Sequence, residues 1–316
     1  MDARRSRRRA LRRERGSVWP LVLVAALLVL VAAGVAVFAW GRHGVGGDEA
    51  ATASASPSPR ASRAGPGAAG SRRLATPAPT PGFVEHPRPV PILVYHHVMD
   101  DPKGPPLVTM STRRFRSQMD WLARNGYEAV TLRRVYDAWT GEGTLPARPV
   151  VISFDDGYVD QARNAAPVLR ERGWPAQLDL VFEALYLGAT PPAGRLTPDM
   201  VCSVLDDGWE LTSHSYSHPD LTRLYGAQLR RQLVVSRRRL RETFHVPVDF
   251  FCYPGGICTK RVKRAVRNAG YLAATGTRYG AATPRDLYSL PRIYCYRGET
   301  TAVFASRLRE TLAAAE

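Results

Sequence analysis

Apolar and polar residues follow two alternating patterns along residues 90–316. Short runs rich in β-branched and aromatic residues, which are typical of strands, occur at 90–96, 128–132, 149–154, 176–182, 209–214, 249–254 and 271–277. Between them, apolar residues recur at helical spacing, most clearly at 113–127, 226–244 and 259–271. Strands that alternate with helices in this way predict one α/β domain with a largely parallel sheet, of the kind that closes into a barrel.

A different pattern covers the start of the chain. Residues 17–40 contain no charged side chain, and about 20 apolar residues in a helix span the hydrocarbon core of a bilayer. Residues 1–16 hold eight arginines and two acidic residues, which by the positive-inside rule keep this end in the cytoplasm. We therefore expect an uncleaved, single-pass transmembrane signal-anchor that exports the rest of the chain to the outer side of the cell membrane. A cleavable signal peptide is the alternative, although its apolar region is usually about 7–15 residues long.

Residues 41–89 separate this apolar stretch from the α/β domain. They are rich in Ala, Ser, Pro, Gly and Thr, and they lack the large apolar side chains that offset the entropy of ordering a chain. We expect them to form a disordered linker. The predicted organisation is thus a cytoplasmic tail at 1–16, an anchor at 17–40, a linker at 41–89 and a globular domain at 90–316.

A formal net charge of +16 is typical of a protein that binds nucleic acid. The distribution of this charge along the chain argues against that partner. Residues 1–16 carry +6 and residues 41–89 carry +3, which leaves +7 on residues 90–316. The charge of the tail sets membrane topology and lies against anionic lipid, and an exported domain does not meet nucleic acid. The remaining excess is typical of a solvated basic surface, or of a surface that attracts an anionic polymer of the envelope.

Four cysteines lie in the part of the chain that we expect to be exported: Cys202, Cys252, Cys258 and Cys295. Disulfides can form outside the cell, and four cysteines allow three pairings. Buried free thiols are an equally good interpretation. The sequence therefore predicts no particular pairing.

Polar residues stand at the ends of several predicted strands, where parallel α/β folds hold their active sites. They are His96 and His97, Asp155 and Asp156, and His214 with His218 four residues later. An isolated His-x-x-x-His pair is commonly a solvated helix start, but four of the five histidines after residue 90 stand at two strand ends. This grouping favours a functional site.

Two histidines and one carboxylate are a typical ligand set of a catalytic metal, which leaves one coordination position open for water. Nitrogen and oxygen ligands suit Zn2+, with Co2+, Ni2+, Mn2+ or iron as alternatives. A metal ion also explains why two aspartates are adjacent despite their repulsion. Their side chains can point apart, so that one binds the ion while the other takes a proton from water. The pattern therefore predicts metal-assisted hydrolysis.

Three motifs, SFDDGY at 153–158, HSYSH at 214–218 and FCYPGG at 251–256, together resemble the polysaccharide deacetylase family, the NodB-homology carbohydrate esterases of carbohydrate esterase family 4. VPILVYHHV and LPRI resemble the branch of this family that deacetylates poly-N-acetylglucosamine. The resemblance covers about residues 90–305 and implies a single distorted (β/α) barrel with a divalent metal, often zinc.

The resemblance also implies roles for individual residues. Asp155 matches the general base of the family, and Asp156, His214 and His218 match its metal ligands. The backbone N–H of Gly255, just after the proline of the third motif, matches the group that helps to stabilise the oxyanion.

Two departures from the family pattern bear on these roles. Cys252 stands where the family usually has an arginine, and Arg292 in LPRIY is our candidate to orient Asp155 in its place. The chain also has no histidine after His245, although many relatives draw a general acid from that region. In the poly-N-acetylglucosamine branch an early histidine plays this part, so we expect His96 to protonate the leaving amine. A purely structural His96 is the alternative.

We therefore expect an envelope-anchored, metal-dependent hydrolase that removes N-acetyl groups from polymeric N-acetylglucosamine, such as peptidoglycan or a poly-N-acetylglucosamine-like exopolysaccharide. Its expected partners are this N-acetylated polysaccharide and the membrane. One alternative keeps the fold and the metal but cleaves acetyl esters of a polysaccharide. Another is a glycan-binding protein with a degenerate site, which the missing late histidine favours and the intact metal set argues against.

Overall fold

Seven parallel strands close into a barrel within the part of the chain that the computed structural model describes, residues 87–101, 104–185 and 194–315. The strands are β1 (Ile92–Tyr95), β2 (His97–Val98), β3 (Thr109–Met110), β4 (Glu128–Ala129), β5 (Pro149–Asp155), β6 (Gln177–Leu180), β7 (Glu210–Ser213), β8 (Phe250–Cys252), β9 (Ala273–Tyr279) and β10 (Leu290–Tyr294). The barrel runs in the order β1-β10-β9-β8-β7-β6-β5, and β5 pairs back to β1. The α/β barrel predicted from the sequence is thereby confirmed.

Two short pairings lie outside this ring. β4 pairs with the first residues of β5, where Glu128 is opposite Pro149. β2 and β3 form a separate parallel ladder, in which His97 is opposite Thr109.

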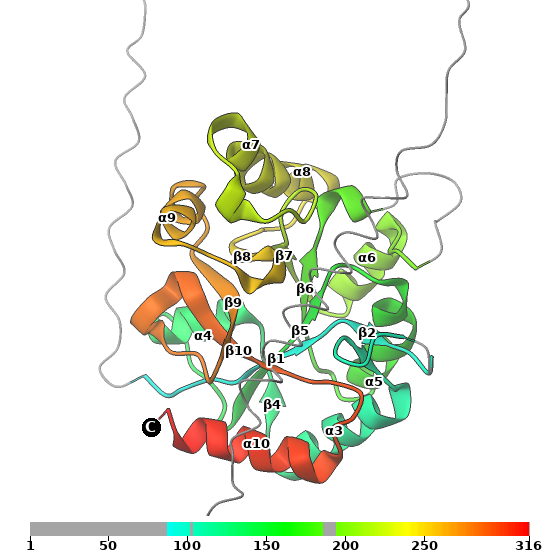
Figure 1. Cartoon of the computed structure of the whole chain (residues 1–316). Helices are drawn as coiled ribbons and strands as arrows, with labels where there is room; N and C mark the ends of the chain where they lie inside the picture. Colours follow the sequence, from blue (N-terminus) through cyan, green and yellow to red (C-terminus); the bar gives the residue numbers. More distant parts are fainter. Residues whose placement is uncertain (1–86, 102–103, 186–193, 316) are drawn as a thin grey trace, which may run out of the picture. The chain divides into compact units, whose positions relative to one another are not determined.

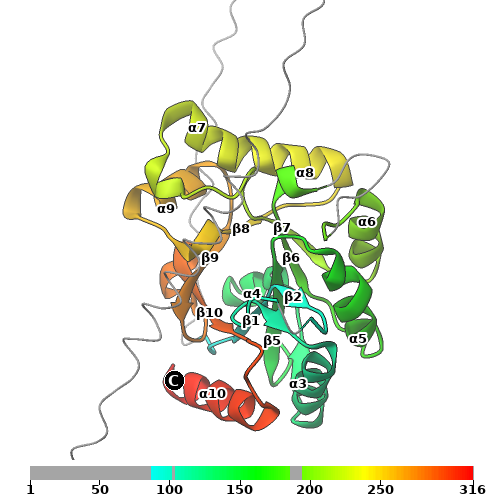
Figure 2. The same ribbon diagram turned by 45° about the vertical axis from the view of Figure 1, so that its right-hand side comes forward.

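Helices surround the barrel on its outside (Figures 1 and 2). The α-helices are α3 (Thr112–Arg124), α4 (Leu132–Trp139), α5 (Ala166–Arg170), α6 (Pro198–Asp206), α7 (Gly226–Arg230), α8 (Ser236–Phe244), α9 (Lys260–Asn268) and α10 (Thr301–Ala313). Short 3₁₀ turns are η2 (Phe182–Ala184), η3 (Leu221–Arg223), η5 (Pro254–Gly256) and η6 (Pro284–Ser289). Two π-helical turns, η1 (Gln161–Ala165) and η4 (Arg231–Val235), lead into α5 and α8.

Hydroxyl side chains determine where several helices begin. Ser111, Thr131 and Thr259 each accept a hydrogen bond from the backbone N–H three residues later, which satisfies one free donor of the first helical turn. Thr131 also explains one difference from the predicted elements. The run at 128–132 was predicted to be a strand throughout, but β4 ends at Ala129 because Thr131 caps α4.

The core lies inside the barrel and between the barrel and its helices. All residues of β1 and β5 are buried, as in parallel sheets that are covered on both faces. The ring of Phe154 stacks on Trp209 with 4.9 Å between centroids, and Trp209 is 4% exposed. Outside the barrel, Trp121 of α3 meets Phe304 of α10 edge to face. Trp209 is therefore a core side chain and does not face a ligand.

β10 is a barrel strand that the hydrophobic pattern did not predict. Its sequence LPRIY contains a proline and an arginine, which interrupt an apolar run. Arg292 is nevertheless only 1% exposed. The strand can carry this charge into the interior because a carboxylate pairs with it there, as described below.

The remaining predicted segments lie at the N-terminus. The predicted tail and anchor, and all of the predicted linker except its last three residues, lie outside the described residues. Within the described ranges, no helix is both long enough and apolar enough to cross a membrane.

Candidate active site

The carboxyl ends of β1, β5 and β7 bring the predicted site residues together at one rim of the barrel. His96 follows β1, and its Nε2 lies 3.7 Å from Oδ2 of Asp155 at the end of β5. His214 follows β7, and its Nε2 lies 3.5 Å from Oδ1 of Asp156. Chain segments more than 100 residues apart thus meet at this rim, as the strand-end argument predicted.

Asp156, His214 and His218 form a triangle of potential metal ligands. The Nε2 atoms of the two histidines are 3.1 Å apart, and the Nε2 atom of His218 is 3.4 Å from Oδ1 of Asp156. Ligand atoms about 2.0–2.2 Å from a tetrahedral ion lie about 3.3–3.6 Å from one another. The three atoms therefore need to move only a few tenths of an ångström to hold one divalent cation.

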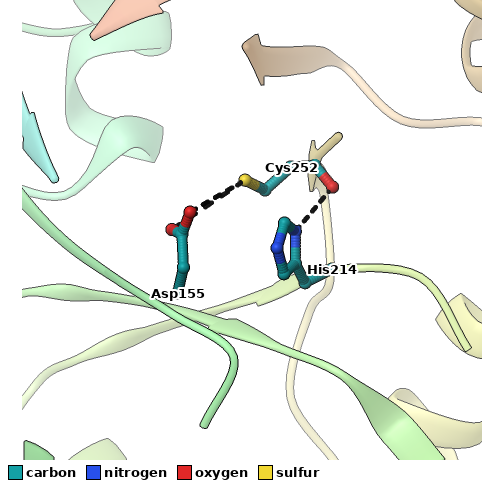
Figure 3. A group of neighbouring side chains, drawn as sticks. All are labelled: Asp155, His214 and Cys252. Atoms are coloured by element: carbon teal, nitrogen blue, oxygen red, sulfur yellow. Dashed lines mark hydrogen bonds between the residues drawn. The ribbon is translucent and has the colours of Figure 1, made fainter. Parts of the chain in front are cut away.

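The hydrogen bonding of His214 also suits a metal ligand. Its Nδ1 donates a hydrogen bond to the backbone carbonyl of Cys252 (Figure 3). The two atoms are 2.9 Å apart, and the His214 side chain is 2% exposed. The proton is therefore held on Nδ1, and Nε2 presents its lone pair to Asp156 and His218. Partial burial and the neighbouring His214 lower the pKa of His218, which favours its neutral, ligating form.

Left-handed backbone conformations aim these side chains. Among the described residues, four non-glycine residues have a positive φ, and three of them are Asp156 (76°), Ser215 (73°) and His218 (58°). Such conformations cost free energy and persist where the surrounding structure enforces them, often at functional sites. Gly157, with φ of 76°, completes the turn after Asp156, where a Cβ would lie 2.4 Å from Leu180.

A second group of potential ligands, Asp155, His214 and Cys252, is less suited to a metal (Figure 3). Burial raises the pKa of the Cys252 thiol well above its usual value, whereas a metal ligand has to be a thiolate. The Cys252 sulfur lies 3.9 Å from both oxygens of Asp155, and both oxygens already accept hydrogen bonds from an arginine. We therefore favour Asp156, His214 and His218.

Asp155 forms a buried, bidentate ion pair with Arg292. Nη1 and Nη2 of the arginine lie 2.7 and 2.9 Å from the two carboxylate oxygens, and the arginine Nε donates to the carbonyl of Gly276. Burial would raise the pKa of Asp155, but Arg292 overrides this effect and holds the pKa well below its usual value. The contact expected for Arg292 is present, although the arginine comes from β10 and not from the strand of Cys252.

His96 lies on the other side of the Asp155 carboxylate. Its side chain is 15% exposed, and its ring stacks at 6.4 Å on Tyr294. Burial lowers the pKa of His96, and Asp155 partly opposes this effect. The imidazole is therefore mostly neutral at neutral pH until a proton reaches it.

Two glutamines that the sequence did not single out hold the strand-end loops, and each lies in a π-helical turn. Nε2 of Gln161 donates to the carbonyls of His96 and Asp155, at 2.9 and 2.6 Å. Oε1 of Gln232 accepts from the backbone N–H groups of Tyr216 and Ser217, both at 3.0 Å. A π-helical turn shifts the helical register and turns one residue inward, which no periodicity in the sequence indicates.

Asp179 of β6 is a further carboxylate below the site that the sequence analysis did not select. It is fully buried, and its Oδ2 lies 3.6 Å from Nη1 of Arg292. Burial and the nearby Asp155 raise the pKa of Asp179 to about 7. Arg292 thus faces two acidic side chains. The available signal was a single charge within the apolar run at 176–182.

Gly255 follows β8 in the turn η5, with φ of 59°. It stands three residues after Cys252, whose carbonyl accepts the hydrogen bond from His214. The third motif is therefore linked to the ligand set through the backbone.

Other residues considered in the sequence lie apart from the candidate chemistry. His97 bonds Asp160 through Nδ1 at 2.7 Å and stacks on Tyr158, which indicates a structural role. His245 is an exposed residue at the end of α8. All four cysteines of the chain fall within the described residues, and there each is a free thiol.

Comparisons with known proteins agree with these motifs. Residues 142–274 match the family model described as polysaccharide deacetylase. The chain is 26% identical over 223 residues to YxkH of Bacillus subtilis (strain 168), whose name assigns it to this family, and the match covers 70% of this chain and 77% of YxkH.

Two further proteins add to this picture. The poly-β-1,6-N-acetyl-D-glucosamine N-deacetylase of Escherichia coli (strain K12) is 33% identical over 100 residues, which are 32% of this chain and 14% of that protein. The crystal structure of BA0330 from Bacillus anthracis, also named after the family, matches with a TM-score of 0.61 at 25% identity and covers 70% of this chain and 69% of its own.

Proposed function

Because the chain carries a polysaccharide deacetylase domain, we propose that it is a metal-dependent hydrolase that removes N-acetyl groups from polymeric N-acetylglucosamine in the cell envelope. One observation carries this proposal. The ligand triangle of Asp156, His214 and His218 lies beside an ion-paired Asp155, and His96 is within 3.7 Å of that carboxylate. This arrangement supports the proposal because amide hydrolysis of this kind requires metal ligands, a proton acceptor and a proton donor close together.

The metal site has the ligand chemistry of a hydrolytic zinc centre, with two imidazole nitrogens and one carboxylate oxygen. Asp156, His214 and His218 would hold the ion, for which Zn2+ is our choice and Co2+, Ni2+ and Mn2+ are alternatives. When bound, the ion supplies Lewis-acid polarisation of the acetyl carbonyl and a lowered pKa for water.

The side chains perform the proton transfers. Asp155 accepts a proton from the attacking water, and Arg292 holds the plane of its carboxylate fixed. The water oxygen then bonds to the carbonyl carbon, while the N–H of Gly255 donates to the oxygen that becomes negative. Because the pKa of Asp155 is so low, the proton passes readily across 3.7 Å to Nε2 of His96.

His96 completes the reaction when the carbon–nitrogen bond breaks. It donates its proton to the departing nitrogen, and the products are acetate and a free amine on the sugar. His96 therefore acts as an acid only after it has received a proton from Asp155. This order suits an imidazole whose pKa is lowered by burial.

The location of the activity rests on the N-terminal sequence. We propose that residues 17–40 anchor the chain in the cell membrane with its N-terminus in the cytoplasm, and that residues 41–89 carry the domain into the envelope. The substrates within reach would be peptidoglycan or a poly-N-acetylglucosamine-like exopolysaccharide. The poly-β-1,6-linked substrate in the name of the Escherichia coli relative motivates the second choice.

The experiment measures the release of free amine by the purified chain in neutral detergent. Oligomers of β-1,6- and β-1,4-linked N-acetylglucosamine and peptidoglycan are offered after chelation and again after zinc is restored. We expect activity to disappear with chelator and return with zinc, and H218A to need more zinc for the same rate. D155N should retain zinc but lose turnover by a factor of at least about 100.

Two results would redirect this proposal. Release of acetate from an acetylated xylan without amine release from any of these polymers would favour an esterase. Zinc-loaded, folded protein that binds the oligomers but releases neither product would favour a glycan-binding protein.

A further inference from the structure

Positive charge is unevenly distributed over the domain. Residues 214–270 contain 12 lysines and arginines and three acidic residues, a net charge of +9. The rest of residues 90–316 contains 18 basic and 20 acidic residues, a net charge of −2. The whole positive excess of the domain therefore resides in the segment that follows β7 and β8.

This segment folds into neighbouring helices. α7, α8 and α9 lie together on one side of the molecule, next to β7 and β8, in both views (Figures 1 and 2). Hydrogen bonds join them. Arg261 of α9 donates to the carbonyls of Thr222 and Leu224 before α7, and Arg237 of α8 donates to the carbonyl of Ala269 after α9.

Six exposed cations of these helices have no carboxylate partner in the described part of the chain, and they define what we call the basic face: Arg230, Arg231, Arg241, Lys260, Arg264 and Arg267. The exposed Arg238 and Arg239 of α8 lie near Glu242 and are not included. On α9, Lys260, Arg264 and Arg267 are spaced so that they share one side of the helix, opposite the buried Val262 and Val266.

Several arginines elsewhere in the domain are neutralised by carboxylates. Arg116, Arg170 and Arg172 pair with Glu171, Asp207 and Asp120, respectively. The basic face has no such partners, so its charges add up to a positive potential at the surface.

The basic face begins next to the candidate active site. The guanidinium of Arg231 lies 4.3 Å from the centre of the Tyr216 ring, and Tyr216 stands between the ligands His214 and His218. The adjacent Gln232 holds the same loop through two backbone N–H groups. A ligand bound to Arg231 would therefore lie close to the loop that carries His214 and His218.

We infer that the basic face binds a polysaccharide that carries phosphate or carboxylate groups, while one of its acetamido sugars occupies the active site. This inference deepens the proposed function, on which it rests for the reaction itself. Arginine binds both anions through paired N–H donors. A membrane surface is also anionic, but a site for lipid headgroups has no reason to reach the loop of His214 and His218. The contact between Arg231 and Tyr216 joins the basic face to that loop and therefore favours a polymeric substrate. The substrate class is thus an anionic, N-acetylated polymer.

The test compares two triple variants of the full chain in neutral detergent. R230Q/K260Q/R264Q removes three charges of the basic face. R113Q/R124Q/R134Q removes three exposed charges from α3 and α4 and is the matched control. The substrates are hyaluronan oligomers, which have an acetamide and a carboxylate in each repeat, and uncharged β-1,4-linked N-acetylglucosamine oligomers.

We expect the KM for hyaluronan oligomers to rise about tenfold in the basic-face variant, with kcat unchanged, because the lost interactions are electrostatic and distant from the reacting bond. The KM for the neutral oligomers should change less than about twofold in either variant. Raising the salt concentration to about 1 M, where the Debye length is about 3 Å, should abolish the difference.

Direct binding separates this inference from the proposed reaction. Calorimetric titration of chelated protein with hyaluronan oligomers, with a poly(glycerol phosphate) and with short-chain phosphatidylglycerol requires no turnover. Weaker binding of either polymer by the basic-face variant alone supports the inference even if no amine is ever released. Equal binding by both variants, no binding by the unmodified chain, or a loss confined to the lipid would overturn it.

Discussion

Arg292 shows how one side chain can compensate for a motif residue that this chain lacks. Cys252 stands at the usual arginine position, and Arg292 reaches Asp155 from another strand with two hydrogen bonds. Both partners are almost completely buried, with side chains 1% and 4% exposed. Burying two charges is costly, so such a pair adds little net stability, but removing one partner leaves a buried charge uncompensated.

The variant R292M should therefore be destabilised by about 3–5 kcal/mol in the metal-free protein, because Asp155 loses its only cationic partner among the described residues. Urea unfolding followed by tryptophan fluorescence measures this loss. The double variant D155L/R292M is the control and should regain most of the stability, because neither partner of the pair is left alone and burial favours the neutral form of the nearby Asp179. A free energy of unfolding that is unchanged in R292M would contradict the role given to the pair.

The candidate metal ligands are a second feature at the residue scale. The spacing of His214 and His218 and the adjacency of the two aspartates were visible in the sequence. The assignment of Asp156 as ligand and Asp155 as base came from the resemblance and remains a prediction. Asp156 faces the histidines because its φ is 76°, whereas Asp155 remains in the strand and faces Arg292.

At the scale of elements, the two π-helical turns are the devices that hold the site loops. η4 lies between α7 and α8, where the sequence predicted one continuous helix at 226–244. The turn directs Gln232 toward the loop of residues 214–218, where it is 7% exposed. The amide satisfies two backbone N–H groups that would otherwise be unpaired near the metal ligands.

We therefore predict that Q232L lowers zinc affinity about 10–100-fold, the effect usual for groups that orient metal ligands. The turnover number at saturating zinc should change much less, since the ligands themselves are intact. Competition with a chromogenic chelator measures the affinity. Q228L, one turn earlier on the exposed side of the same helix, is the matched control and should bind zinc normally. Equal affinities in the two variants would argue against a positioning role for Gln232.

At the scale of the whole molecule, the metal set joins two separate strands of the barrel. Asp156 follows β5, whereas His214 and His218 follow β7, and β6 lies between these strands. An ion bound to all three therefore favours the closed barrel over the unfolded chain, in which these residues are about 60 positions apart in sequence.

Zinc at about 100 times its Kd should add about 2.7 kcal/mol of stability. For a domain of this size, that raises the unfolding midpoint by about 5–10 °C. Scanning calorimetry with and without zinc measures the shift. H218A should lose most of it, while H245N, which changes an exposed histidine at the end of α8, should retain it. A full shift in H218A would exclude His218 from the ligand set.

Much of this architecture could be predicted from the sequence, because buried strands and helices produce local patterns of apolar residues. Six of the seven predicted runs contain a barrel strand and the seventh contains β4, which pairs with β5 outside the ring; polar residues at the strand ends, such as Asp155 and His214, marked the rim of the site. The parallel barrel followed from the alternation of strands and helices. The N-terminal anchor, which depends on residues 17–40, remains a prediction from hydropathy alone.

The tertiary structure alone decided which distant side chains meet. Arg292 lies in β10, which the hydrophobic pattern did not predict because the arginine interrupts the apolar run. Its ion pair with Asp155 leaves no periodic pattern in the sequence. Gln161 and Gln232 point inward only because a π-helical turn shifts the helical register. The basic face forms only when α7–α8 and α9 pack side by side. Patterns within one segment follow from local burial, whereas partners across the barrel are selected by closure of the chain on itself.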